Sequence, residues 1–212
     1  MNGDESTANR DVASIIQKHL WNDHRYQISA TASFYKTLQD SIESGSTNPV
    51  GDEEALTSAL THSRAVFSFY NPSLDRGRFS DKEVWWVSTL GFTPSSNDFW
   101  QKASGLNWGE IAEWIDRINI NLSHIGWERE ELQIPLDKDG QQFPLILFAQ
   151  QSVVMLDALE KYVSSEGQMW DKVVDAIRNV QNLVKTEWDR DDNKPYLDWA
   201  IERYKDDFKL ST

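Results

Sequence analysis

Arg117, Asn121 and His124 are the side chains whose types and spacing best fit a catalytic role. Steps of three, four and seven residues return to the same side of a helix, so these residues share one face with Glu113. Metal-independent RNA cleavage needs a base for the ribose 2′-OH proton and a cation for the charged phosphorane. Histidine can be that base near neutral pH, and the arginine fork fits phosphate oxygens. A simpler interpretation stays open, in which Arg117 pairs with Glu113 and His124 is a hydrogen-bonded, partly buried histidine.

The opposite face of this segment is apolar. Its residues follow helical spacing and are Ile111, Ile115, Ile118, Leu122 and Ile125. This pattern predicts an amphipathic helix over residues 109–126, with one side on a core and the other side carrying the polar residues.

Helical spacing of apolar residues also dominates the rest of the chain. It predicts further helices over residues 11–43, 53–70, 141–164, 169–189 and 195–209. Asp52 is expected to cap the second helix, and Asn71-Pro72 to end it, because the residue before a proline avoids the helical region. The polar WNDHR segment at 21–25 is a candidate interruption of the first helix.

The segments between these helices differ in character. Residues 44–52 have the composition of a loop, and DRDDNKP at 189–195 is interpreted as a charged linker. Residues 72–108 are expected to form a long, aromatic-rich connection with one or two short helices. Strand signals are almost absent, so we predict an all-α helical bundle. We expect a flexible N-terminus over residues 1–10 and a single helical domain over residues 11–212.

The composition narrows the class of protein. The chain has 212 residues, no Cys and a net charge of −13, with 34 acidic against 21 basic residues. A disulfide scaffold, a thiolate metal site and a Cys nucleophile are excluded. The acidic charge disfavours unspecific nucleic-acid binding and docking on anionic membranes. The apolar runs are too short to span a bilayer and the N-terminus is polar, so a cytoplasmic protein is expected.

Common catalytic motifs are missing from the sequence. The four His show no HExxH spacing, and there is no phosphate-binding loop, dinucleotide fingerprint or GxSxG elbow. We therefore expect neither a metal nor a cofactor.

Aromatic residues have two interpretations. Trp85, Trp86, Trp100 and Trp108 are expected to pack between helices, with a base-stacking platform as the alternative. The last helix carries Tyr196, Trp199 and Tyr204 among charged residues. It is either a surface for a partner or the last cover on the core.

Three segments resemble conserved stretches of HEPN-like, abortive-infection-type bacterial proteins. INLSHIGWER at 120–129 resembles a helix signature in which a His is followed five residues later by an Arg. HSRAVFSFY at 62–70 resembles the helix that precedes a long loop in such proteins, and GFTPSSNDFW at 91–100 resembles part of that loop. The resemblance covers roughly residues 53–130.

The resemblance implies a HEPN-like helical bundle that commonly dimerises. Many such proteins are metal-independent ribonucleases of toxin–antitoxin or abortive-infection systems, whose motif is Arg, four to six residues, then His. Arg117 and His124 fit this motif with a six-residue spacer. The sequence departs from active members after the Arg, where Ile118 stands in place of Asn, Asp or His. Other HEPN-like proteins are non-catalytic interaction or scaffold modules.

Two hypotheses follow. In the first, the chain is a metal-independent endoribonuclease of a bacterial defence or toxin–antitoxin system, with RNA as substrate, a homodimeric state and an antitoxin or defence protein as partner. His124 is the general base or acid and Arg117 the phosphate clamp. Residues expected to bind the substrate are Asn121, Arg129, His62 and Arg64. For His62 and Arg64 the favoured interpretation is structural, in which they bond helix ends or backbone carbonyls. In the second hypothesis, the chain is a non-catalytic helical interaction protein, and Arg117, Asn121 and His124 form a buried hydrogen-bond network.

Overall fold

The chain folds into α-helices wherever its structure is described. The computed structural model describes residues 4–46, 53–70, 105, 107–123, 145–165 and 171–208. The helices in these ranges are α1 (Asp4–Glu43), α2 (Glu53–Tyr70), α5 (Trp108–Ser123), α6 (Leu145–Ser165), α7 (Asp171–Trp188) and α8 (Lys194–Phe208). These ranges contain no strand, so the prediction of an all-α class is confirmed for them. The aromatic-rich connection predicted over 72–108 lies almost entirely outside the described residues.

Helix α1 is the longest element, with 40 residues. The predicted interruption at residues 21–25 is wrong, because α1 is continuous through this segment. The polar residues there divide by side: His24 is buried, whereas Asn22 is exposed. The segment contains neither Gly nor Pro, so nothing in it removes backbone hydrogen bonds. The helix begins at Asp4, within the range expected to be a flexible N-terminus.

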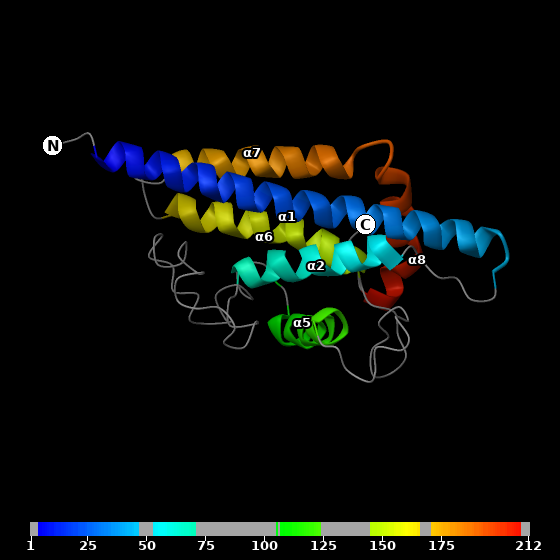
Figure 1. Cartoon of the computed structure of the whole chain (residues 1–212). Coiled ribbons are helices and arrows are strands. Elements are labelled where there is room, and N and C mark those ends of the chain that lie inside the picture. The colour runs from blue at the N-terminus through cyan, green and yellow to red at the C-terminus, as the bar shows by residue number, and fades with distance from the viewer. Residues whose placement is uncertain are drawn as a thin grey trace.

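Four helices lie side by side and form the body of the bundle. Helices α2 and α6 run antiparallel to α1, and α7 runs parallel to it (Figure 1). The Tyr35 hydroxyl accepts a hydrogen bond from the backbone N–H of Ile146 at 3.1 Å, which joins α1 to the start of α6. Arg178 and Gln181 of α7 bond to Glu160 and Asp157 of α6, as antiparallel neighbours do.

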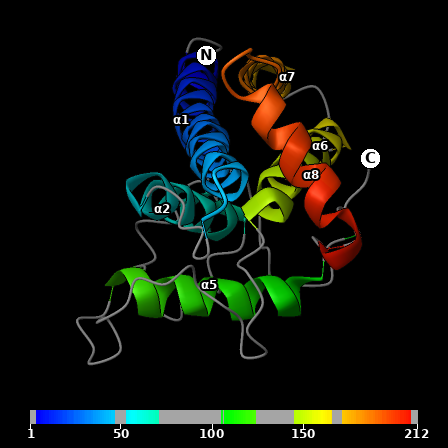
Figure 2. The same cartoon turned by 90° about the vertical axis from the view of Figure 1, so that its right-hand side faces the viewer.

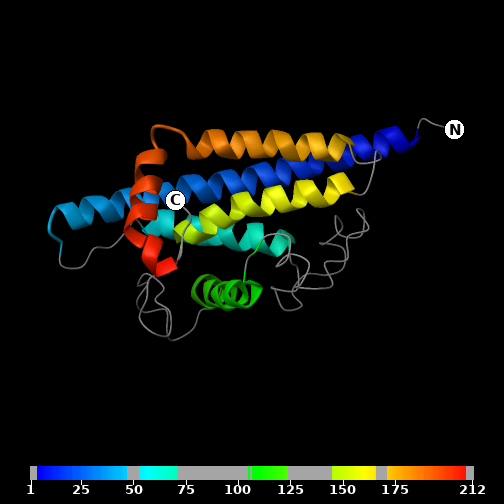
Figure 3. The same ribbon diagram turned by 180° about the vertical axis from the view of Figure 1, so that it is seen from behind.

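The other two helices cross this body. Seen along the bundle, α5 lies crosswise beneath α2, and α8 passes across one end (Figure 2). The view from behind shows α8 against the C-terminal half of α1 and the start of α6 (Figure 3). Helix α5 is therefore a peripheral element that packs on α2.

An aromatic group joins α5 to the bundle. The Phe67 ring of α2 lies 5.0 Å from the Phe148 ring of α6 and 6.1 Å from the Trp108 ring of α5, between ring centroids. All three side chains are buried. Trp108 therefore packs in the core, as expected, and it fixes the start of α5. The other three Trp of the aromatic-rich connection lie outside the described residues.

Two helix ends show how the sequence sets element boundaries. After α1, the N–H of Gly45 bonds to the Ile42 carbonyl and the N–H of Ser46 bonds to the Ser41 carbonyl. Gly45 has a φ of 75°, which glycine adopts without steric cost, so the two bonds close a Schellman motif. Before α5, the Asn107 Oδ1 accepts hydrogen bonds from the N–H groups of Gly109 and Glu110 and caps the helix.

None of the helices in the described ranges has the length and apolar character that crossing a membrane requires.

Candidate functional site

Helix α5 positions Arg117, which the sequence predicts to be the phosphate clamp. The apolar face of α5 is buried, as predicted, through Ile111, Ile115 and Ile118. Arg117 is half-buried, and its guanidinium carbon lies 5.1 Å above the ring of Trp114. A cation over an aromatic face contributes about 0.5–1 kcal/mol at a partly exposed position. Trp114 therefore restrains the guanidinium that is proposed to contact a phosphate.

The other residues of the predicted site, Asn121, His124 and Arg129, belong to the end of α5 or to the sequence after it. Asn121 lies in the last turn of α5, and nothing is described of its side chain. His124 follows directly after the last residue of α5 and lies outside the described residues, as does Arg129. The pairing of Arg117 with His124 therefore stays a prediction.

His62, predicted to bind the substrate, faces α1. Its Nδ1 lies 3.6 Å from the Asp23 carboxylate, and its ring stacks on the ring of Tyr26 at 5.3 Å. These partners are side chains of the neighbouring helix rather than helix ends. Arg64, predicted with it, is half-buried on α2.

A second polar layer lies inside the bundle, between α1 and α2. The His24 Nε2 and the Tyr70 hydroxyl share a hydrogen bond of 3.2 Å, and the Gln27 side-chain amide donates to the Ser63 hydroxyl at 2.9 Å. His24, Gln27, Ser63 and Tyr70 are all fully buried. The sequence prediction missed this layer. Its signal was a His at the centre of the apolar spacing Leu20, His24, Ile28.

Burial controls the protonation of this layer. It lowers the pKa of His24 from 6.5 to about 3, because a charged imidazole would lose its hydration there. It raises the pKa of Tyr70 well above 10.0, and the nearby charge of Asp157 raises it further. Both side chains are therefore neutral at physiological pH. The His24 Nδ1 and the Gln27 Oε1 have no hydrogen-bond partner among the described residues.

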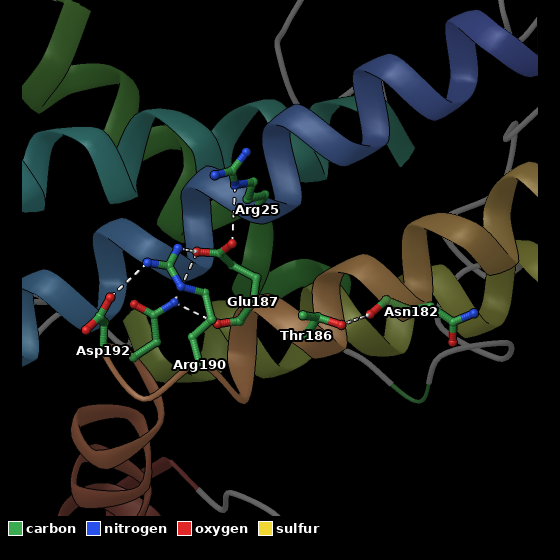
Figure 4. Close-up of polar contacts among 7 residues, drawn as sticks. Arg25, Asn182, Thr186, Glu187, Arg190 and Asp192 are labelled. Atoms are coloured by element: carbon green, nitrogen blue, oxygen red, sulfur yellow. Dashed lines mark hydrogen bonds and ion pairs between the residues drawn. The ribbon is translucent and has the colours of Figure 1, made fainter.

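Glu187 is the centre of an ionic cluster at the corner between α7 and α8. Its carboxylate accepts a hydrogen bond from Arg190 at 2.8 Å and pairs with Arg25 of α1 at 3.2 Å (Figure 4). Arg190 also donates to Asp192 at 2.9 Å. The Glu187 side chain is only 5% exposed, so two guanidinium groups compensate one buried carboxylate.

Asn193 closes the same corner. Its side-chain amide donates to the Glu187 carbonyl at 2.7 Å, and its own carbonyl accepts the first hydrogen bonds of α8. The charged linker predicted over residues 189–195 is present as a closed turn over 189–193, but Lys194 and Pro195 already belong to α8. The sequence analysis did not predict this ionic cluster. Its signal was Glu187, which continues the apolar spacing of Val180 and Val184 and is buried with them.

Metal binding has no support in the described part of the chain. The described residues hold no group of three or more His, Asp or Glu side chains placed to bind a metal ion.

Comparisons with known proteins do not assign the chain to a family. No protein-family model, curated protein or solved structure matches it. The class that the described residues define is an all-α helical bundle with buried polar contacts between α1 and α2. The HEPN-like assignment stays a prediction from the sequence.

Proposed function

We propose that the chain is a metal-independent endoribonuclease of HEPN type, acting in a bacterial defence or toxin–antitoxin system. The observation that carries the proposal is the position of Arg117. It is partly accessible on a peripheral helix, and the buried stripe of that helix holds it in register. An accessible cation is what a phosphate clamp requires.

The proposed reaction is a transesterification. His124 takes the proton of the ribose 2′-OH, the 2′ oxygen forms a bond to phosphorus, and the bond to the 5′ oxygen breaks. Arg117 stabilises the charge on the phosphorane, and Asn121 orients the phosphate. The protonated His124 then returns its proton to the leaving 5′ oxygen. The products carry a 2′,3′-cyclic phosphate and a 5′-hydroxyl. Arg129, His62 and Arg64 are proposed to bind the strand, and a homodimer with an antitoxin or defence partner is the proposed assembly.

The test is cleavage of a labelled RNA in EDTA by the purified protein. The wild type is expected to give fragments with cyclic-phosphate ends. His124→Ala should remove activity, and Arg117→Ala should lower it at least about a hundredfold, as loss of one charge-stabilising donor does. His19→Ala and Arg178→Ala, at exposed positions on α1 and α7, are the matched controls and should cleave normally. Undiminished cleavage by His124→Ala would sink the assignment of the base.

A second function, that of a non-catalytic helical interaction protein, is favoured by two observations. The Arg117 guanidinium is engaged over Trp114, and Ile118, which stands where active members carry a polar residue, is fully buried. Here His124→Ala is expected to lower the melting temperature by several degrees, and no RNA cleavage should occur. RNA cleavage by the purified wild type that disappears in His124→Ala would exclude this alternative.

A further inference from the structure

Two cations lie over aromatic rings where α8 crosses α1. The Lys36 Nζ is 5.8 Å from the centroid of the Tyr196 ring, and the Arg203 guanidinium carbon is 5.9 Å from that of Trp199. The Trp199 ring also lies 6.3 Å from the buried ring of Tyr35 on α1, which ties the two helices together. Lys36 and Arg203 are exposed, and both rings over which they lie are half-buried. We call these four residues, Lys36, Tyr196, Trp199 and Arg203, the α1–α8 cation–aromatic patch.

The cations of the patch have no carboxylate partner within the described ranges. Neither Lys36 nor Arg203 forms an ion pair with a described residue, whereas other cations of α8 do. Lys194 pairs with Asp198 at 2.8 Å, and Lys205 pairs with Glu202 at 2.7 Å. These pairs neutralise two of the carboxylates near the patch, Asp198 and Glu202. Asp206 and Asp207 follow on the last turn, and neither is ion-paired with Arg203. The net charge of −13 disfavours general binding of polyanions, so an anionic ligand is expected only at exposed cations without ion pairs, such as Lys36 and Arg203.

The aromatic rings of the patch restrict which class of anionic ligand fits it. A peptide of acidic residues alone would satisfy the cations but has no flat rings to stack, whereas a single-stranded nucleic acid supplies phosphates and bases together. Proteins bind such strands by combining cations with aromatic side chains, and an Arg plane on a Trp is itself a stacking surface. We propose that the α1–α8 cation–aromatic patch binds single-stranded nucleic acid. The patch uses no residue of the proposed cleavage site, so this binding requires no cleavage.

The test is fluorescence anisotropy with a labelled oligothymidylate of about 12 nucleotides, within the site sizes of single-strand-binding proteins. This probe has no 2′-OH, so the proposed ribonuclease cannot cleave it. The double variant K36Q/R203Q should weaken binding by at least about tenfold, as loss of two phosphate contacts and a stacking surface does. The wild-type salt dependence should include a slope of about −1.4 from these two contacts, absent in the variant.

The control is K161Q/K172Q, which removes two exposed lysines from α6 and α7. Its affinity should change by less than about twofold, because the net charge changes equally but the patch is intact. An equal loss of affinity in both double variants would show that the effect arises from net charge alone, and this would overturn the proposal. Absence of binding by the wild type would overturn it, as would equal competition by an oligoglutamate peptide. RNA cleavage is measured in parallel. Loss of oligothymidylate binding overturns the strand-binding proposal alone, whereas the proposed ribonuclease function fails only if the wild type does not cleave RNA.

Discussion

Individual charged and polar side chains inside this bundle set its response to pH and to substitution. Glu187 and His24 illustrate the two ways in which a titratable group is accommodated in a core. Glu187 is compensated by Arg25 and Arg190 and by the amide of Asn193. His24 has no charge to pair with among the described residues, so burial keeps it neutral.

His24 makes the fold sensitive to acid. Its pKa is about 3 in the folded chain against 6.5 for a solvated imidazole, so between these values the unfolded chain binds more protons. Stability from this group is therefore complete above about pH 6.5 and is lost as the pH falls toward 3. We expect urea unfolding of His24→Gln to show a shallower loss of stability than the wild type between pH 6.5 and pH 4. His19→Gln, at an exposed position, should follow the wild type. Parallel curves for wild type and His24→Gln would contradict the assignment.

Glu187→Gln tests the ionic cluster. The variant leaves two guanidinium groups around a neutral amide, and losing one partner of a buried ion pair is destabilising. Because the two Arg side chains are 39% and 42% exposed, water screens part of the effect, and we expect a loss of about 1–2 kcal/mol. The readout is the urea midpoint at low salt. Glu202→Gln removes the partner of an exposed pair with Lys205 and should cost less than about 0.5 kcal/mol. Equal midpoints for the two variants would show that the cluster does not stabilise the corner.

At the scale of elements, specific local contacts set three of the described helix ends. Asn107 caps the start of α5, Asn193 joins the end of α7 to α8, and Gly45 ends α1. These ends determine which turn of each helix meets its neighbour. Asn107 begins the helix that carries Arg117, whereas Gly45 lies at the end of α1, so a change at Gly45 is expected to act on stability without altering the candidate site.

Gly45→Ala is the direct test of the α1 end. No atom lies within 4 Å of an added Cβ, so the cost arises only from the positive φ of 75°. A non-glycine residue in this conformation costs roughly 1–2 kcal/mol, which for a chain of this size lowers the melting temperature by a few degrees. The measurement is thermal unfolding followed by circular dichroism. Ser33→Ala, at an exposed helical position of α1, serves as the comparison. An unchanged melting temperature for Gly45→Ala would mean that the motif at the end of α1 opens without cost.

At the scale of the whole molecule, α1 is the element around which the others assemble. It packs against α2, α6, α7 and α8, while α5 is attached through α2. The candidate cleavage residues on α5 and the α1–α8 cation–aromatic patch therefore lie on different parts of the bundle (Figures 1 and 2). This separation lets cleavage and strand binding be tested by independent substitutions.

The sequence by itself determined the helices and the buried side of α5. Apolar spacing located α2, α5, α6, α7 and α8 to within a few residues, and it identified Ile111, Ile115 and Ile118 as core residues. Such a pattern is local, because it reflects the geometry of one helix. It placed Arg117 on the polar side of α5 for the same reason.

Only the tertiary structure decided which helices meet. Pairs such as His62 with Asp23, and Glu187 with Arg25, join residues far apart in the chain, and no local period predicts them. By its sequence, the polar WNDHR segment is a candidate interruption of the first helix. In the bundle, His24 instead finds Tyr70 on α2, and Arg25 finds Glu187 on α7. Burial and partners from other helices outweighed local composition, since a polar group in a core is stable only where another element satisfies it.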